Sequence, residues 1–317
     1  MEILSFAFNG VAPICLMALI GMLLRRLGWL SRETAGKVNQ LCFKLFIPMQ
    51  IFRQIYRSDL SAAADWKLLA FCLGLTALTL ALLCLIVPRF IKRRVWAGEF
   101  IQGVFRSNSA ILGLPLLINL YGDAAGSALS LVLPLMIILY NLCAPVVLMH
   151  FSESGQKKQG PAALLKKVFT NPFLIAALLG TFFSATGLGT LLPDFLTSTV
   201  TSLSNVGTPL ALIGLGAITE IETVRRCGKT ALTASLFRLL LIPIPVLCLG
   251  ALLGFRGVQM GVLVCFFSTP TAVGGYVLAR NIDGDGELAG QILLQTTLLS
   301  FLTMFLTIAA LRGLGLM

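Results

Sequence analysis

Charged residues are scarce in this chain, and their scarcity excludes an ordinary soluble domain. Only 12% of the 317 residues are charged, 57% are hydrophobic, and the mean hydropathy is +0.93. So little polar material cannot cover a water-soluble globule of this size. Apolar runs of about 20 residues match the length of a membrane-crossing helix. The sequence therefore predicts an all-α integral membrane protein.

Histidine is nearly absent, and closely spaced cysteine pairs are missing. His150 is the only histidine, and the eight cysteines form no C-x-x-C pair. These absences argue against zinc hydrolysis, histidine catalysis and a disulfide framework. "CGKT" at 227–230 imitates the end of a P-loop, but Thr223 stands where the leading glycine is required. "DGDGE" at 283–287 imitates a calcium loop, but Leu294 replaces the bidentate glutamate. We therefore expect no enzyme, no cofactor and no metal site.

The apolar segments number ten, separated by turn and charge signals. A polar, basic stretch, "SESGQKKQGPAALLKK", divides them into two groups of five. We expect a first five-helix repeat at 1–150, a short cytoplasmic linker at 151–170 and a second repeat at 171–317. The expected spans are 5–27, 33–56, 66–88, 98–121, 124–150, 171–188, 192–218, 230–253, 257–280 and 286–311.

The two halves repeat each other. Pro48 matches Pro209 at an offset of 161, Ser107 matches Ser268 at the same offset, and Asp123 matches Asp285 at 162. Five spans are an odd number, so the two copies would enter the membrane from opposite sides. This is the inverted-repeat arrangement of many secondary transporters.

Basic residues give an independent prediction of topology. The segments that follow spans 1, 3, 5, 7 and 9 carry 16 of the 24 basic residues, and the opposite side, with both termini, carries five. The positive-inside rule then places both termini outside and the linker in the cytoplasm. This bias explains the net charge of +11, and no nucleic-acid partner is expected. The sixteen are Arg25, Arg26, Arg32, Lys37, Arg89, Lys92, Arg93, Arg94, Lys157, Lys158, Lys166, Lys167, Arg225, Arg226, Lys229 and Arg280.

Helices 4 and 9 carry the candidate binding site. "FRSNSAILGLPLL" and "FFSTPTAVGG" place small polar residues, glycine and proline near mid-membrane at corresponding positions. Pro115 and Pro270 interrupt helical hydrogen bonding, and interrupted backbone in a membrane is tolerated where it lines a cavity or is buried in protein. Half-helix N-termini would attract a carboxylate there. Side-chain donors would come from Asn108, Ser109, Thr269 and Thr271. The alternative is that these prolines only shape helix packing.

Three basic residues lie within spans. Arg106, just before the first interruption, would either hold an anion by a bidentate contact or snorkel and cap helix carbonyls. Lys44 and Arg238 are expected to snorkel or to form structural pairs. Glu99 has two interpretations as well: a proton-coupling acid, or a first-turn acid on the helix dipole. Asp285 and Asp123 are expected to cap the helices that follow them.

Four segments carry a resemblance to a known family: "NSAILGLPLLINLYGDAAGS", "KVNQLCFKLFIPMQIF", "LSNVGTPLALIGLGAI" and "STPTAVGGYVLARN". Together they resemble the auxin efflux carrier family, which includes the plant PIN auxin exporters and many bacterial carriers. The similarity extends over essentially all ten expected helices. The paired interruptions in helices 4 and 9 are its most specific part.

The resemblance implies an arrangement and residue roles. Helices 4 and 9 would cross at the substrate site. Helices 1, 2, 6 and 7 would form a scaffold that dimerises, and helices 3–5 and 8–10 an elevator-like transport domain. Asn108 matches the asparagine that contacts the substrate carboxylate, and Pro115 and Pro270 match the crossover prolines. The chain departs from the family in its short linker and in Thr269 and Thr271, where an asparagine would be the closer symmetry mate of Asn108.

The predicted function is a secondary carrier for small organic anions in the cytoplasmic membrane, surrounded by lipid. The alternatives are an anion channel, since broken helices also build pores, and a sodium- or proton-coupled organic acid symporter. A membrane enzyme is disfavoured because no nucleophile and base are visible as a pair.

Overall fold

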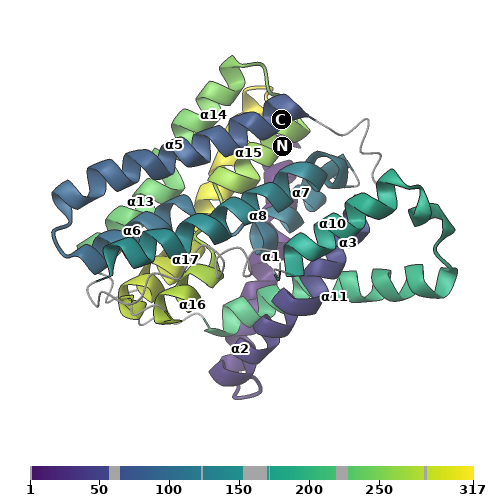
Figure 1. The fold of residues 1–317 in the computed structure, drawn as a ribbon, viewed down its shortest axis with the longest axis horizontal. Coiled ribbons are helices and arrows are strands. Elements are labelled where there is room, and N and C mark those ends of the chain that lie inside the picture. Colours follow the sequence, from purple (N-terminus) through teal and green to yellow (C-terminus); the bar gives the residue numbers. More distant parts are fainter. Residues whose placement is uncertain are drawn as a thin grey trace. The chain divides into compact units, whose positions relative to one another are not determined.

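A computed structural model describes residues 2–56, 65–122, 124–152, 170, 172–218, 228–281 and 284–317, and helices make up nearly all of them (Figure 1). Most of the expected linker, and Asp123, lie outside the described residues. The α-helices are α1 (Glu2–Arg26), α2 (Arg32–Leu41), α3 (Ile47–Tyr56), α5 (Trp66–Phe90), α6 (Arg94–Phe105), α7 (Leu114–Tyr121), α8 (Ala124–Phe151), α10 (Pro172–Ala185), α11 (Asp194–Ile218), α13 (Lys229–Leu236), α14 (Pro243–Leu252), α15 (Val258–Phe267), α16 (Val273–Asn281) and α17 (Gly286–Gly313).

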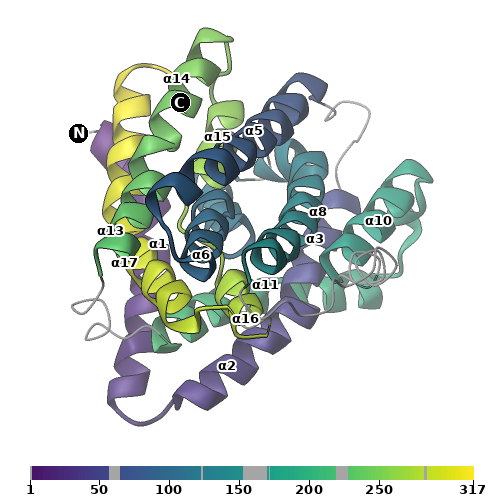
Figure 2. The same cartoon turned by 60° about the vertical axis from the view of Figure 1, so that its left-hand side comes forward.

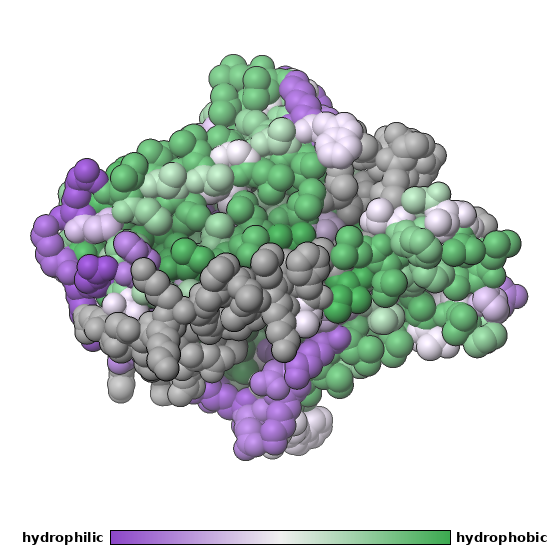
Figure 3. All heavy atoms as spheres, in the orientation of Figure 1, coloured by the Kyte–Doolittle hydropathy of each residue, from purple (hydrophilic) through white to green (hydrophobic). Residues whose placement is uncertain are grey.

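Each of the ten apolar segments falls on helical structure. Among the described residues, six helices are long and apolar enough to cross a membrane: Ile3–Arg26, Trp66–Phe90, Val132–Phe151, Asp194–Ile218, Lys229–Leu252 and Gly286–Gly313. Apolar side chains cover the visible face of α5, and polar residues gather at its turn into α6 (Figure 3). Exposed leucines such as Leu78 and Leu85 would face water in a soluble protein. These features are those of an integral membrane protein.

The fourth and ninth segments are broken, as the sequence predicts. In the fourth, α6 ends at Phe105, and helical structure resumes only at Ser109. In the ninth, α15 ends at Phe267 and α16 begins at Val273. The first interruption therefore lies at 106–108, well before Pro115, whereas the second, at 268–272, contains Pro270. Pro115 instead lies in the first turn of α7, directly after the π-turn Ser109–Gly113.

Three π-helical turns each precede a proline by the same spacing. Cys42–Phe46, Ser109–Gly113 and Phe237–Leu241 each end two residues before a proline, at Pro48, Pro115 and Pro243. Proline lacks the amide donor, and its ring clashes with the carbonyl four residues earlier in an α-helix. A π-turn bonds each amide to the carbonyl five residues back, as Ile242 N does to Phe237 O at 3.0 Å. We infer that the three π-turns let these segments contain a proline and remain helical.

The chain forms two compact units, each described here by itself. Unit 1 comprises 1–66, 110–137 and 166–219, and unit 2 comprises 67–109, 138–165 and 220–317. In unit 1, α11 packs on α1, α2 and α3, and α10 packs on α3. In unit 2, α13 packs on α17 and α14 on α15 (Figure 2). The assignment of helices to a scaffold and a transport domain stays a prediction.

Unit 1 depends on close backbone approach. A Cβ placed on Gly216 of α11 would overlap Ala18 O of α1, and one on Gly21 of α1 would overlap Ile213 O of α11. Arg25 reinforces this pair, because its Nη1 donates to Ala217 O at 3.0 Å. Glycine is needed at these two positions because the obstacle is backbone, which cannot turn aside as a side chain can.

We predict opposite effects for two glycine-to-alanine substitutions. Gly216→Ala forces α1 and α11 apart and should lower the free energy of unfolding by about 2 kcal/mol or more. Gly74→Ala, in α5, meets nothing within 4 Å and should raise it by up to about 1 kcal/mol through helix propensity. Thermal unfolding of the purified protein in detergent measures both. Equal effects would contradict the close approach of α1 and α11.

Candidate functional site

The two interruptions lie against each other within unit 2. Ser107 and Thr271 form an isolated antiparallel bridge, and Asn108 N donates to Pro270 O at 2.9 Å. The hydroxyls of Ser107 and Thr269 are 2.7 Å apart, and the Thr269 hydroxyl also donates to Cys265 O at 2.9 Å. These bonds pair polar groups that a continuous helix would have satisfied internally. We call the two facing interruptions, 106–108 and 268–272, the crossing, and these hydrogen bonds stabilise it.

Arg238 closes the carbonyl side of the crossing. Its side chain is 1% exposed. Its Nε donates to Thr269 O at 2.8 Å, Nη1 to Val104 O at 3.1 Å and Nη2 to Phe266 O at 2.8 Å. Val104 is in the last turn of α6 and Phe266 in the last turn of α15. One guanidinium thus serves the C-terminal ends of both broken helices, where the helix dipole favours a cation.

Sequence reasoning missed this position of Arg238. Structural pairing was the right class of role, but the partners are three carbonyls at the crossing. The available signal was an arginine within an apolar segment, which by itself marks a functional position in a membrane protein. Lys44, the other residue given this interpretation, has an exposed side chain in the π-turn Cys42–Phe46.

Other groups at the crossing supply hydrogen-bond donors and a second positive charge. Arg106 is half-buried, its Nη2 donates to Asn141 Oδ1 at 2.9 Å, and its guanidinium lies over Gly274, in the first turn of α16. Asn108 is 3% exposed, and its Nδ2 is without a partner within the described part of the chain. The buried hydroxyl of Ser268 is likewise unpartnered there. A buried amide donor left unpaired is costly, and a ligand acceptor would relieve that cost.

The remaining predicted site residues have varied positions. Ser109 is buried, and its carbonyl accepts a weak hydrogen bond from Cys265 Sγ at 3.8 Å. Thr269 is fully buried, and its hydroxyl is engaged within the crossing. Thr271 is buried, and its amide donates to Thr296 Oγ1 at 3.4 Å. Pro115 lies in unit 1, whereas the other predicted site residues belong to unit 2.

Glu99 does not occupy the first turn of its helix. Because α6 begins at Arg94, four residues before the expected start, Glu99 lies in the second turn and is 0% exposed. Its Oε2 accepts from Gln102 Nε2 at 3.0 Å. The interpretation as a first-turn acid on the helix dipole is therefore wrong.

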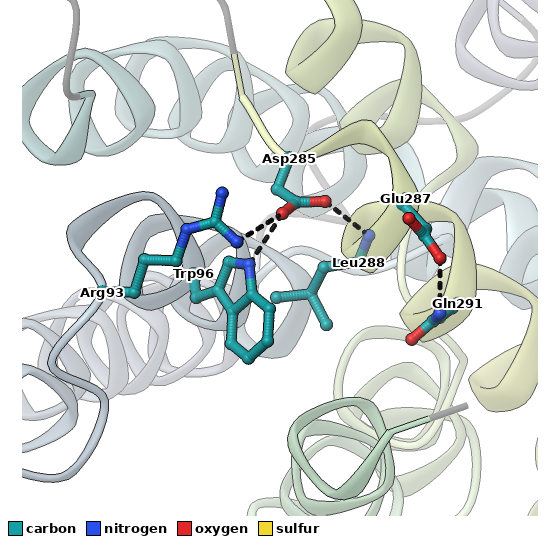
Figure 4. A network of polar contacts seen from close by, with 6 residues as sticks. All are labelled: Arg93, Trp96, Asp285, Glu287, Leu288 and Gln291. Atoms are coloured by element: carbon teal, nitrogen blue, oxygen red, sulfur yellow. Dashed lines mark hydrogen bonds and ion pairs between the residues drawn. The ribbon is translucent and has the colours of Figure 1, made fainter. Parts of the chain in front are cut away.

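Asp285 confirms the expected cap of the last helix. Its Oδ1 accepts from the amide of Leu288 at 3.0 Å (Figure 4). Its Oδ2 accepts from Trp96 Nε1 at 2.7 Å and lies 3.5 Å from Arg93 Nη1. This network joins the start of α6 to the start of α17, which fixes the N-terminal end of α6, away from the crossing.

The crossing has a clear electrostatic division. Carbonyl oxygens are satisfied by Arg238, while Arg106, the Asn108 amide and the first turn of α16 present positive charge or donors. A guanidinium beside a helix N-terminus is electrostatically unfavourable unless an anion lies between them. The arrangement can therefore bind a carboxylate.

We predict that Arg238→Met destabilises the protein by about 3 kcal/mol or more, because three buried carbonyls lose their donors. Arg238→Lys should recover part of that loss, since an ammonium keeps the charge without the planar fork. Thermal unfolding of the two variants and the parent measures the difference. A methionine variant as stable as the parent would contradict the capping role.

Comparisons with known proteins agree with these observations. The sequence matches the family described as membrane transport protein over residues 6–308. It is 28% identical to an uncharacterized transporter of Methanothermobacter thermautotrophicus over 93% of this chain and 95% of the relative. It is 24% identical to a Rhizobium meliloti protein named "Putative malonate transporter", over 92% of each.

The fold is also similar to a solved structure. The sodium proton antiporter MjNhaP1 from Methanocaldococcus jannaschii, at pH 8, superimposes with a TM-score of 0.59 over 98% of this chain and 97% of that one, at 12% identity. Since the family match covers nearly the whole sequence, the protein is a transporter and not an enzyme. The chain belongs to the membrane transport protein family, the auxin efflux carrier family that its sequence resembles.

Proposed function

We propose that this protein is a secondary carrier that moves small organic anions across the cytoplasmic membrane, with the substrate carboxylate bound at the crossing. The observation that carries the proposal is the pairing of Arg106 with the first turn of α16. Both are positive, and Arg106 donates to the neutral amide oxygen of Asn141. A transported carboxylate would supply the missing negative charge.

Asn108 adds specificity to this site. Its Nδ2 is buried without a partner among the described residues, and a carboxylate oxygen would accept from it. Its backbone amide donates to Pro270 O. This hydrogen bond fixes the backbone from which the Asn108 side chain extends. A neutral ligand of the same shape would gain less from these donors than an anion does.

Dicarboxylates are the substrate class that we favour, and malonate is the first compound to test. The support is the name carried by the R. meliloti relative and the two kinds of donor at the crossing, a guanidinium and an amide. A short diacid could place one carboxylate on each. Monocarboxylates and auxin-like acids are the alternative substrates among small organic anions.

The wider mechanism that we propose follows the family resemblance. Ten membrane spans would form two inverted five-helix repeats, supported by interruptions at an offset of 161 residues, at Ser107 and Ser268. A scaffold of helices 1, 2, 6 and 7 would form a homodimer, and helices 3–5 and 8–10 would carry the substrate in elevator fashion. An anion channel is the competing function.

We predict saturable malonate counterflow in proteoliposomes containing the purified protein. Asn108→Ala should weaken malonate binding by roughly 1 to 3 kcal/mol, as expected when a hydrogen bond to a charged ligand is lost. Asn9→Ala, which removes an exposed asparagine of α1, is the matched control and should behave as the parent. Unitary currents without counterflow would favour the channel. Equal loss of malonate and an uncharged analogue in Asn108→Ala would contradict a carboxylate site.

We predict that the termini face outside and the linker faces the cytoplasm, because of the basic-residue bias. Single cysteines at Ser154 and at the exposed Leu314, in a chain whose native cysteines are replaced, should react with impermeant reagents from opposite sides of the membrane. Labelling of both from the outside would contradict the inverted topology.

A further inference from the structure

Glu99 is a buried acid that has no role in the proposed anion site. It is 0% exposed, and within the described residues its Oε1 is unpartnered. Its other oxygen accepts from the neutral amide of Gln102. An ionised carboxylate buried in this way, with a neutral donor and no cation, costs far more free energy than the protonated acid. The surroundings therefore accommodate Glu99 best when it carries a proton.

The groups that face Glu99 do not include a cation among the described side chains. A Cβ on Gly284 would overlap Oε1, and Ala279 O, on α16, lies close to the same point. Asp285, from the start of α17, acts electrostatically on Glu99, is itself an acid paired with Arg93 at 3.5 Å, and presents its neutral backbone amide to the Glu99 carboxyl. On the other helices that pack on α6, Arg238 is committed to three carbonyls and Lys229 and Glu287 are exposed. The side chains of Arg280 and Asp283 lie outside the described residues.

A row of polar side chains connects Glu99 with the crossing. Glu99, Gln102 and Arg106 are spaced three and four residues apart, so they lie on one face of α6 and its continuation. Each rests on a glycine, in the order Gly284, Gly275 and Gly274, at which a Cβ would meet the polar side chain. Gln102 Oε1 is buried and unpartnered among the described residues. The row is therefore polar from Glu99 to the guanidinium that would hold the anion.

Resting on the proposed carrier function, we propose that Glu99 is the proton-binding site of this transporter and that one proton travels with each organic anion. Seven residues separate Glu99 from Arg106, which is about 10 Å along a helix. An anion arriving at Arg106 adds a negative charge at that distance and favours the protonated form of Glu99, on the order of tenfold in a partly shielded interior. Linkage makes the effect reciprocal, so proton binding favours anion binding equally.

The step is a proton transfer alone. On the side where the anion enters, the Glu99 carboxylate takes one proton from water and becomes a neutral acid. On the other side, departure of the anion removes the negative charge that favoured the acid, and Glu99 returns the proton to water. The carrier would thereby couple anion uptake to a proton gradient, without a sodium ion.

Transport by proteoliposomes with a clamped membrane potential tests the proposed proton coupling. For the parent, malonate should exchange by counterflow, and an inward proton gradient of one pH unit should drive up to about tenfold accumulation, because one pH unit is worth a factor of ten. Sodium gradients should have no effect. Glu99→Gln should keep counterflow but lose accumulation driven by the proton gradient. Glu287→Gln, which alters an exposed acid of the same unit, is the matched control and should keep both.

The outcomes separate the two proposals. A parent without malonate counterflow would overturn the proposed function, and the coupling proposal with it. Counterflow without proton-driven accumulation, or accumulation by Glu99→Gln equal to that of the parent, would overturn the coupling alone. If Glu99→Gln loses counterflow, Glu99→Asp decides, since it keeps a titratable carboxyl. Recovery of proton-driven accumulation in Glu99→Asp supports the proposal, and no recovery gives Glu99 a structural role and overturns it.

Discussion

Breaking two helices inside an apolar environment leaves carbonyl oxygens that water cannot reach, and the rest of this structure depends on how they are satisfied. Arg238 meets that demand with three hydrogen bonds from a single guanidinium. Buried carbonyls tolerate a fixed cation because the two helix ends already carry partial negative charge. With those ends neutralised, the interruptions can persist as ordered structure, and the polar residues beside them need not refold into continuous helix.

The two buried or half-buried arginines at the crossing, Arg238 and Arg106, have different partners. Arg238 donates to three carbonyls, while Arg106 faces a neutral amide oxygen and the amide end of α16. Arg238 therefore stabilises the protein's own backbone, and Arg106 is available to bind a ligand. Two buried cations in one apolar unit would be unfavourable if neither had such partners. Their different partners explain why a basic, acid-poor crossing is stable.

Much of the fold could be predicted from the sequence, because apolar length and interruption by polar residues are local signals. The interruption of the fourth and ninth segments follows from the residues present, although the first interruption lies at 106–108 and not at Pro115. The role of Arg238 could not be predicted, because its partners are backbone carbonyls of α6 and α15, whose positions no side-chain pattern records. Glu99 was wrongly expected in the first turn of its helix because α6 starts earlier than the apolar run.

The π-turn that holds Arg238 also has a consequence for how this segment tolerates insertions and deletions. A π-helical turn contains one residue more than an α-helical turn of the same height. Removing any one residue within Phe237–Leu241 would restore an ordinary α-helical turn, and the ring of Pro243 would then clash with the carbonyl four residues earlier. In this segment the number of residues is therefore as constrained as their chemistry, and homologous chains should differ here by substitution and seldom by length.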